Sequence, residues 1–169
     1  DLEGPVLFAA NHHLHLDNGL IIKALPSHWR RRLAVAAWAE IWRSPVWAVL
    51  NPLLGNGFPF SKEGAVRASL DNLGHVLDDG WSVLIYPEGE LTIGGPMKPL
   101  KSGIGLIAVE ASLPVVPVRL HIQSMGTPWQ FPVLRRGKIE VRFGRPLAFS
   151  PETSYLEATN AIAHSLEAI

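Results

Sequence analysis

The chain has 169 residues, 47% of them hydrophobic, and its 15 basic residues balance 15 acidic ones to a formal net charge of zero. This length and apolar content fit one globular domain with a substantial core and exclude a disordered chain. The charge balance gives no basic field of the kind that recommends nucleic acid as a partner, and the absence of cysteine excludes disulfides and thiolate chemistry.

Short apolar runs alternate with helix-like segments along the chain. In chain order, we expect a strand at 5–10, a helix at 17–25, a strand at 33–37, a helix at 45–54, an extended piece at 58–60, a helix from 63 to the end signal at 78–80, a strand at 81–86, a helix at 102–112, strands at 115–118 and 139–143, and a helix at 151–168. Strands separated by helices predict an α/β fold with a mixed, mostly parallel sheet flanked by helices and the site on one edge. Within it, Pro117 predicts an edge strand or a bulge.

The whole of residues 1–169 is expected to form this single domain. Because the chain starts at Asp1 and reaches a strand almost at once, we expect it to be excised from a longer protein. The longest uncharged stretch, 44–61, contains three prolines and two glycines, so no transmembrane segment is expected. Nearby, Trp38, Trp42 and Trp47 are spaced by four and five residues, which suits either a membrane–water boundary or an ordinary buried helix.

Three histidines and a carboxylate lie within Asn11-His12-His13-Leu14-His15-Leu16-Asp17, directly after the first predicted strand. His12 and Asp17 are too far apart in sequence to be neighbours on one regular helix face. They can meet if the chain turns at the strand end and Asp17 begins a helix. A carboxylate there would hold the imidazole in one tautomer, which lets His12 accept a proton from a hydroxyl as a general base.

The same stretch also permits a metal site. The spacing His-x-His-x-Asp, over residues 13–17, is that of a zinc-binding signature in which alternating side chains converge on the metal. That signature continues with another histidine, whereas Asn18 follows Asp17 here. A zinc-dependent hydrolase therefore stands as an alternative to base catalysis by His12.

Two further stretches carry polar groups at predicted strand ends. Tyr86-Pro87-Glu88-Gly89-Glu90 follows the strand at 81–86, and ligand sites of parallel α/β sheets collect outside the carboxyl ends of strands. Lys62 lies after the extended piece at 58–60 and just before a helix. Helix N-termini attract anions, so Lys62 is a candidate for binding phosphate.

Five blocks of this chain, in their order and approximate spacing, resemble the glycerolipid acyltransferase family, which includes the 1-acylglycerol-3-phosphate acyltransferases. The blocks are Asn11-His12 with Asp17, Phe58 to Lys62, Tyr86-Pro87-Glu88-Gly89, Pro99-Leu100-Lys101-Ser102-Gly103, and Leu113-Pro114-Val115-Val116-Pro117-Val118. The resemblance runs from about residue 5 to residue 147. Residues 61–80 also look like acyltransferase modules fused to acyl-activating enzymes.

The resemblance implies an O-acyltransferase that moves a fatty acyl group from acyl-CoA or acyl carrier protein to a hydroxyl of a lysophospholipid or glycerol-phosphate-type acceptor. It implies that His12 is the base and that Asp17 orients it, with no metal, no other cofactor and no covalent acyl-enzyme. Glu88 and Gly89 would lie in the acceptor pocket, with Lys62 on the phosphate and Pro117 near the acyl donor. Lys101, in the fourth block, joins the substrate-binding candidates.

Some residues depart from the family pattern. Leu14 stands where the first block usually has serine, and Lys62 replaces an arginine, which exchanges a two-pronged donor for a point charge. Glu90-Leu91-Thr92 stands where the family usually reads Thr-Arg-Ser, so that block lacks its phosphate-binding arginine; Lys98 or Lys101 could compensate. The sequence predicts acyl transfer but leaves the acceptor open.

Both substrates of such a reaction lie in or near membranes, so we expect a cytoplasmic protein bound peripherally to a membrane surface. Besides the zinc hydrolase, a lipid-binding module whose catalytic site has decayed stands as an alternative. The donor carrier, acyl length, acceptor and oligomeric state are not predicted.

Overall fold

The structure is a computed structural model that describes residues 2, 4–13, 16–38, 43–46, 56–60, 66–92, 95–122 and 139–169. Within these ranges, the side chains of residues 38 and 66–69 are not described. The helix expected at 45–54 lies mostly outside the described residues, as do Trp42, Trp47, Lys62 and His15.

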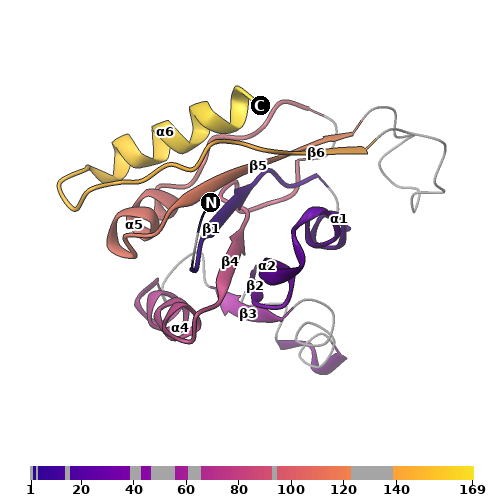
Figure 1. Cartoon of the computed structure of the whole chain (residues 1–169), viewed down its shortest axis with the longest axis horizontal. Helices are drawn as coiled ribbons and strands as arrows, with labels where there is room; N and C mark the ends of the chain where they lie inside the picture. The colour runs from indigo at the N-terminus through magenta and orange to yellow at the C-terminus, as the bar shows by residue number, and fades with distance from the viewer. Residues whose placement is uncertain are drawn as a thin grey trace.

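Six strands form one sheet in the order β3-β2-β4-β1-β5-β6. All neighbouring strands are parallel except β5 and β6, which are antiparallel. The bounds are β1 Leu7–Ala10, β2 Leu33–Trp38, β3 Gly57–Phe60, β4 Ser82–Ile85, β5 Val115–Ile122 and β6 Ile139–Phe143. This arrangement confirms the predicted mixed, mostly parallel sheet, and it places β1 between β4 and β5 in the interior of the sheet (Figure 1).

Helices cover both faces of the sheet (Figure 1). Their bounds are α1 Asp17–Ala24, α2 Ser27–Arg30, α4 Val66–Asp78, α5 Gly103–Glu110 and α6 Tyr155–Glu167. Residues from α4, α5 and α6 pack with one core cluster, and residues from α1 and α2 pack with the other. Successive residues of β1 alternate between the two, since Leu7 and Ala9 join the first cluster whereas Phe8 and Ala10 join the second. This is the two-residue period of a strand buried on both faces.

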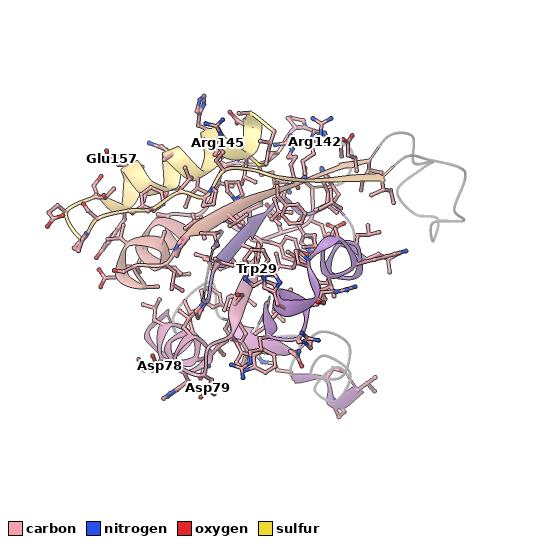
Figure 2. All side chains as sticks on the ribbon, in the orientation of Figure 1. Trp29, Asp78, Asp79, Arg142, Arg145 and Glu157 are labelled. Atoms are coloured by element: carbon pink, nitrogen blue, oxygen red, sulfur yellow. The ribbon has the colours of Figure 1, made fainter. Side chains whose placement is uncertain are left out.

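An aromatic contact packs α2 against the sheet. The ring of Trp29 meets the ring of Phe8 edge-on, with centroids 5.6 Å apart. Trp29 lies near the middle of the view in Figure 2, whereas the labelled charged residues Asp78, Asp79 and Glu157 lie toward its outline. The one-turn helix α2 was not predicted, because a single turn is too short to show a helical period.

Of the two expectations for Pro117, the edge strand was wrong and the bulge is confirmed. β5 lies between β1 and β6 in the sheet and so is not an edge strand. The carbonyl of Pro117 accepts a hydrogen bond from the Gly144 N–H at 2.8 Å, and β6 ends at Phe143. The N–H that proline lacks would point to the same side of the strand. On that side the antiparallel pairing shifts by one residue, because Val118 pairs with Phe143 whereas Val115 pairs with Leu147. A proline is therefore tolerated at this point of an interior strand.

Among the described residues, no helix has both the length and the apolar character needed to cross a membrane. The other predicted elements that fall on described residues are present at nearly the expected positions, and β5 extends four residues further than expected, to Ile122.

Candidate active site

The candidate site lies where β1 and β4 end. These strands are parallel neighbours, so the segments that follow them leave the sheet at the same edge. After β1 come His12 and His13, and after β4 comes the segment 86–92. Residues about 76 positions apart in the sequence are thereby brought together.

His12 and Asp17 form the contact that the sequence predicted. The chain turns after β1, and Asp17 is the first residue of α1, where the helix N-terminus favours a negative charge. The buried Asp17 Oδ2 lies 2.9 Å from His12 Nδ1 and accepts a 2.6 Å hydrogen bond from the backbone N–H of His13. Because a carboxylate can only accept, His12 carries its proton on Nδ1. In the neutral imidazole with this tautomer, Nε2 carries the lone pair, and the His12 side chain is 22% exposed.

Tyr86 covers one face of the His12 imidazole. Its ring stacks on the imidazole with centroids 4.1 Å apart and planes 20° apart. Its hydroxyl donates a 2.6 Å hydrogen bond to Asn18 Oδ1, next to Asp17 on α1. Burial, and then the negative charge of Asp17, raise the pKa of Tyr86 well above the ordinary 10.0, so the phenol keeps its proton. The imidazole is therefore held by Asp17 at one nitrogen and by an aromatic ring on one face.

Glu88 joins three segments around the imidazole. Glu88 is 1% exposed, and its carboxylate accepts hydrogen bonds from three donors among the described residues. Oε1 accepts from the backbone N–H of His12 at 2.9 Å, while Oε2 accepts from the Thr92 hydroxyl at 2.5 Å and from the backbone N–H of Lys98 at 2.8 Å. Within the described part of the chain, N–H and O–H groups of neighbouring loops thus meet both oxygens of this buried carboxylate, and its geometry is that of a clamp on the chain at His12.

The turn that presents Glu88 depends on Gly89. The Gly89 N–H donates to the Tyr86 carbonyl at 3.0 Å, and Gly89 has a φ of 76°, a left-handed conformation that favours glycine. The backbone conformation is therefore sufficient reason for a glycine at this position.

Thr92 completes the link between the two strand ends. Its N–H donates to the His12 carbonyl at 2.7 Å, and its carbonyl accepts from His13 Nδ1 at 2.8 Å. His13 is thus held by the backbone of the 86–92 segment. Among the described residues, no group of three or more His, Asp or Glu side chains is placed to hold a metal ion.

The remaining predicted site residues are spread more widely. Lys101 has an exposed side chain, and its N–H donates to the Pro87 carbonyl at 2.8 Å. Pro117 is buried in β5 in register with Ala9, three residues before His12. Lys62 lies outside the described residues. Lys98, named only as a possible substitute, has its ammonium 3.1 Å from a carboxylate oxygen of Glu90.

Asn11, named from the sequence only as part of a motif, has a structural task. Its buried amide accepts from the Leu120 N–H at 2.7 Å and donates to the Leu120 carbonyl at 3.1 Å. The side chain thereby extends the pairing of β1 with β5 by one step and fixes the point where the chain turns toward His12.

Sequence reasoning missed the contributions of Tyr86, Asn18 and Thr92. An aromatic residue at a strand end before Pro-Glu was visible as a pattern. Its stacking on His12, however, depends on β4 lying beside β1, which the sequence alone does not state.

Comparison with known proteins identifies the family of this chain. A family model described as Acyltransferase matches residues 2–121, which include β1, the 86–92 segment and most of β5. The chain belongs to the acyltransferase family.

Relatives within the acyltransferase family are named for different acceptors. The chain is 29% identical over 117 residues to 1-acyl-sn-glycerol-3-phosphate acyltransferase beta from Homo sapiens, covering 68% of this chain and 40% of that protein. It is 28% identical over 124 residues to lyso-ornithine lipid O-acyltransferase from Pseudomonas aeruginosa, covering 73% of this chain and 46% of that protein. The chain therefore spans less than half the length of these two relatives.

The fold has also been seen in a solved structure. The crystal structure of the 1-acyl-sn-glycerophosphate (LPA) acyltransferase PlsC from Thermotoga maritima superposes with a TM-score of 0.70 at 20% sequence identity, and the match covers 99% of this chain and 66% of that one. At this identity the likeness concerns the fold.

Proposed function

We propose that this acyltransferase domain transfers a fatty acyl group from an acyl thioester to a hydroxyl of a lipid acceptor, with His12 as the general base. The observation that carries the proposal is the pairing of His12 Nδ1 with the buried Asp17 at 2.9 Å. This pairing leaves Nε2 as a proton acceptor on a side chain that solvent reaches. Both curated relatives are named as acyltransferases, which supports the same chemistry.

In the proposed reaction, one residue both accepts and returns the proton. His12 Nε2 takes the proton of the acceptor hydroxyl as its oxygen attacks the thioester carbonyl, and the buried carboxylate of Asp17 stabilises the imidazolium that forms. The tetrahedral intermediate then collapses, the carbon–sulfur bond breaks, and the imidazolium returns the proton to the thiolate. An ester and a free thiol result, with no covalent acyl-enzyme and no cofactor beyond the acyl-CoA or acyl carrier protein that serves as donor.

The other candidate residues enter the proposal as substrate contacts. Lys62 and Lys101 would meet the polar part of the substrates, Glu88 and Gly89 would border the acceptor, and Pro117 would lie near the acyl donor. We also propose a peripheral position at a cytoplasmic membrane surface, because the acceptor and the acyl chain are lipids.

The test is the release of free thiol from acyl-CoA by the full chain in the presence of lysolipid acceptors. His12→Ala is expected to lower turnover by about 10²–10⁴-fold, the usual contribution of a general base, with the fold retained. His75→Ala is the matched control, because His75 is exposed on α4. Near-normal turnover by His12→Ala would refute the mechanism.

Two alternatives make different predictions in the same preparation. A zinc hydrolase would contain stoichiometric metal and would lose activity with a chelator. A decayed lipid-binding module would bind lipid vesicles without any release of thiol.

A further inference from the structure

Glu90 lies in the middle of the segment that borders His12. Two residues before it, Glu88 accepts the His12 N–H, and two residues after it, Thr92 donates to the His12 carbonyl. Two residues of chain span at most about 7 Å, so Glu90 cannot lie far from either anchor. Its side chain is 60% exposed, so this carboxylate reaches solvent beside the candidate base.

Lys98 contacts the same segment through both its backbone and its side chain. Its backbone N–H donates to Glu88 Oε2 at 2.8 Å, which fixes the position of the residue. Its ammonium then lies 3.1 Å from Glu90 Oε1 and donates to the Leu91 carbonyl at 3.3 Å. Two of the three ammonium hydrogens are therefore directed at protein oxygens, and the positive charge of Lys98 is balanced by the more exposed Glu90.

This pair changes the charge that an acceptor headgroup meets. A phosphate monoester carries up to two negative charges, so it would have to displace Glu90 from Lys98 and remain close to the displaced carboxylate. A headgroup that carries an ammonium group can donate to Glu90. If that headgroup also carries an acidic group, the acid can meet Lys98 while the ammonium meets Glu90, and the charges stay balanced. Exposed ion pairs are held weakly, so such an exchange of partners is inexpensive.

We propose that Glu90 and Lys98 form the acceptor headgroup subsite and select a lysolipid whose headgroup carries an ammonium group over one that ends in a phosphate monoester. This inference rests on the proposed acyl transfer at His12 and names the class of acceptor for that reaction.

Three acceptors of matched acyl chain separate the charge effects. Lysophosphatidylethanolamine and lysophosphatidylglycerol share a phosphodiester and differ in the ammonium group, whereas 1-acylglycerol 3-phosphate ends in a monoester. With one acyl-CoA donor, the wild-type chain is expected to use the ethanolamine lipid at least about tenfold better, in kcat/KM, than either other acceptor. The products are identified by mass.

Glu90→Gln removes the charge and keeps the shape of the side chain. It is expected to lower kcat/KM for the ethanolamine lipid by about tenfold and to leave that for the glycerol lipid unchanged or raised. Glu110→Gln, an exposed glutamate at the end of α5, is the matched control and is expected to change neither value. A wild-type preference for the monoester, or equal effects of Glu90→Gln on all three acceptors, would overturn the proposal.

Binding separates failure of this inference from failure of the proposed function. The three lysolipids, below their critical micelle concentrations, are measured by equilibrium dialysis against the wild-type chain and Glu90→Gln. Preferential binding of the ethanolamine lipid that Glu90→Gln removes, without turnover, would retain the subsite and refute acyl transfer. Turnover without that preference would refute the subsite and retain acyl transfer.

Discussion

Replacing Glu88 by glutamine tests whether its carboxylate is the clamp that holds the His12 turn. Oε1 faces the N–H of His12, and Oε2 faces both the Thr92 hydroxyl and the N–H of Lys98. A glutamine amide has one oxygen and one NH₂ group. In either orientation, its NH₂ group must face a backbone N–H, of His12 or of Lys98, and the Thr92 hydroxyl can rotate but the backbone cannot.

The expected loss follows from that conflict. An unsatisfied buried donor costs about 1–3 kcal/mol, so Glu88→Gln should destabilise the fold by about 2 kcal/mol. For a chain of this size, that corresponds to a decrease in Tm of about 4–8 °C. Turnover should fall by about 10–100-fold at a temperature where both proteins are folded, because displacement of the His12 turn by a fraction of an ångström misplaces the base.

The assays are thermal and urea unfolding together with thiol release. Glu140→Gln is the control, since Glu140 is paired with Arg142 on the exposed surface of β6 and such pairs contribute at most about 1 kcal/mol. If Glu88→Gln unfolds like the control, the clamp is refuted. If stability is unchanged while the acceptor KM rises, Glu88 contacts the acceptor directly instead.

Two further predictions concern packing and pH. A Cβ at Gly105 would meet the Tyr155 carbonyl oxygen at the α5–α6 contact, so Gly105→Ala should lower the urea midpoint by several tenths of a molar or more; Gly74→Ala, which meets nothing within 4 Å inside α4, should leave it equal or raise it. An unchanged midpoint for Gly105→Ala would contradict the close approach of the two helices. The pKa of Tyr86 is raised in the folded chain, so its contribution to stability is complete below pH 10 and is lost as the pH rises through the folded pKa. Tyr86→Phe should therefore unfold less readily than wild type as the pH rises above 10, measured relative to their difference at pH 8, and parallel unfolding curves for the two would refute the buried phenol.

Much of this protein is determined by patterns local in the sequence. Short apolar runs between amphipathic segments determine an α/β sheet, because a buried strand and a one-sided helix impose different periods on the chain. The pairing of His12 with Asp17 is of the same kind, since both residues lie in one turn between a strand end and a helix start.

Only the tertiary structure decided what surrounds that pair. The order of the strands sets β4 beside β1, which brings Tyr86 and Glu88 onto His12 from 74 and 76 residues away. The pairing of Lys98 with Glu90 likewise depends on how the loops pack. It occupies with a carboxylate one of the two lysines that the sequence analysis had named as possible phosphate contacts. Periodicity indicates which segments form strands, whereas the crossover connections of the folded chain set the order of those strands, and that order determines the neighbours of the base.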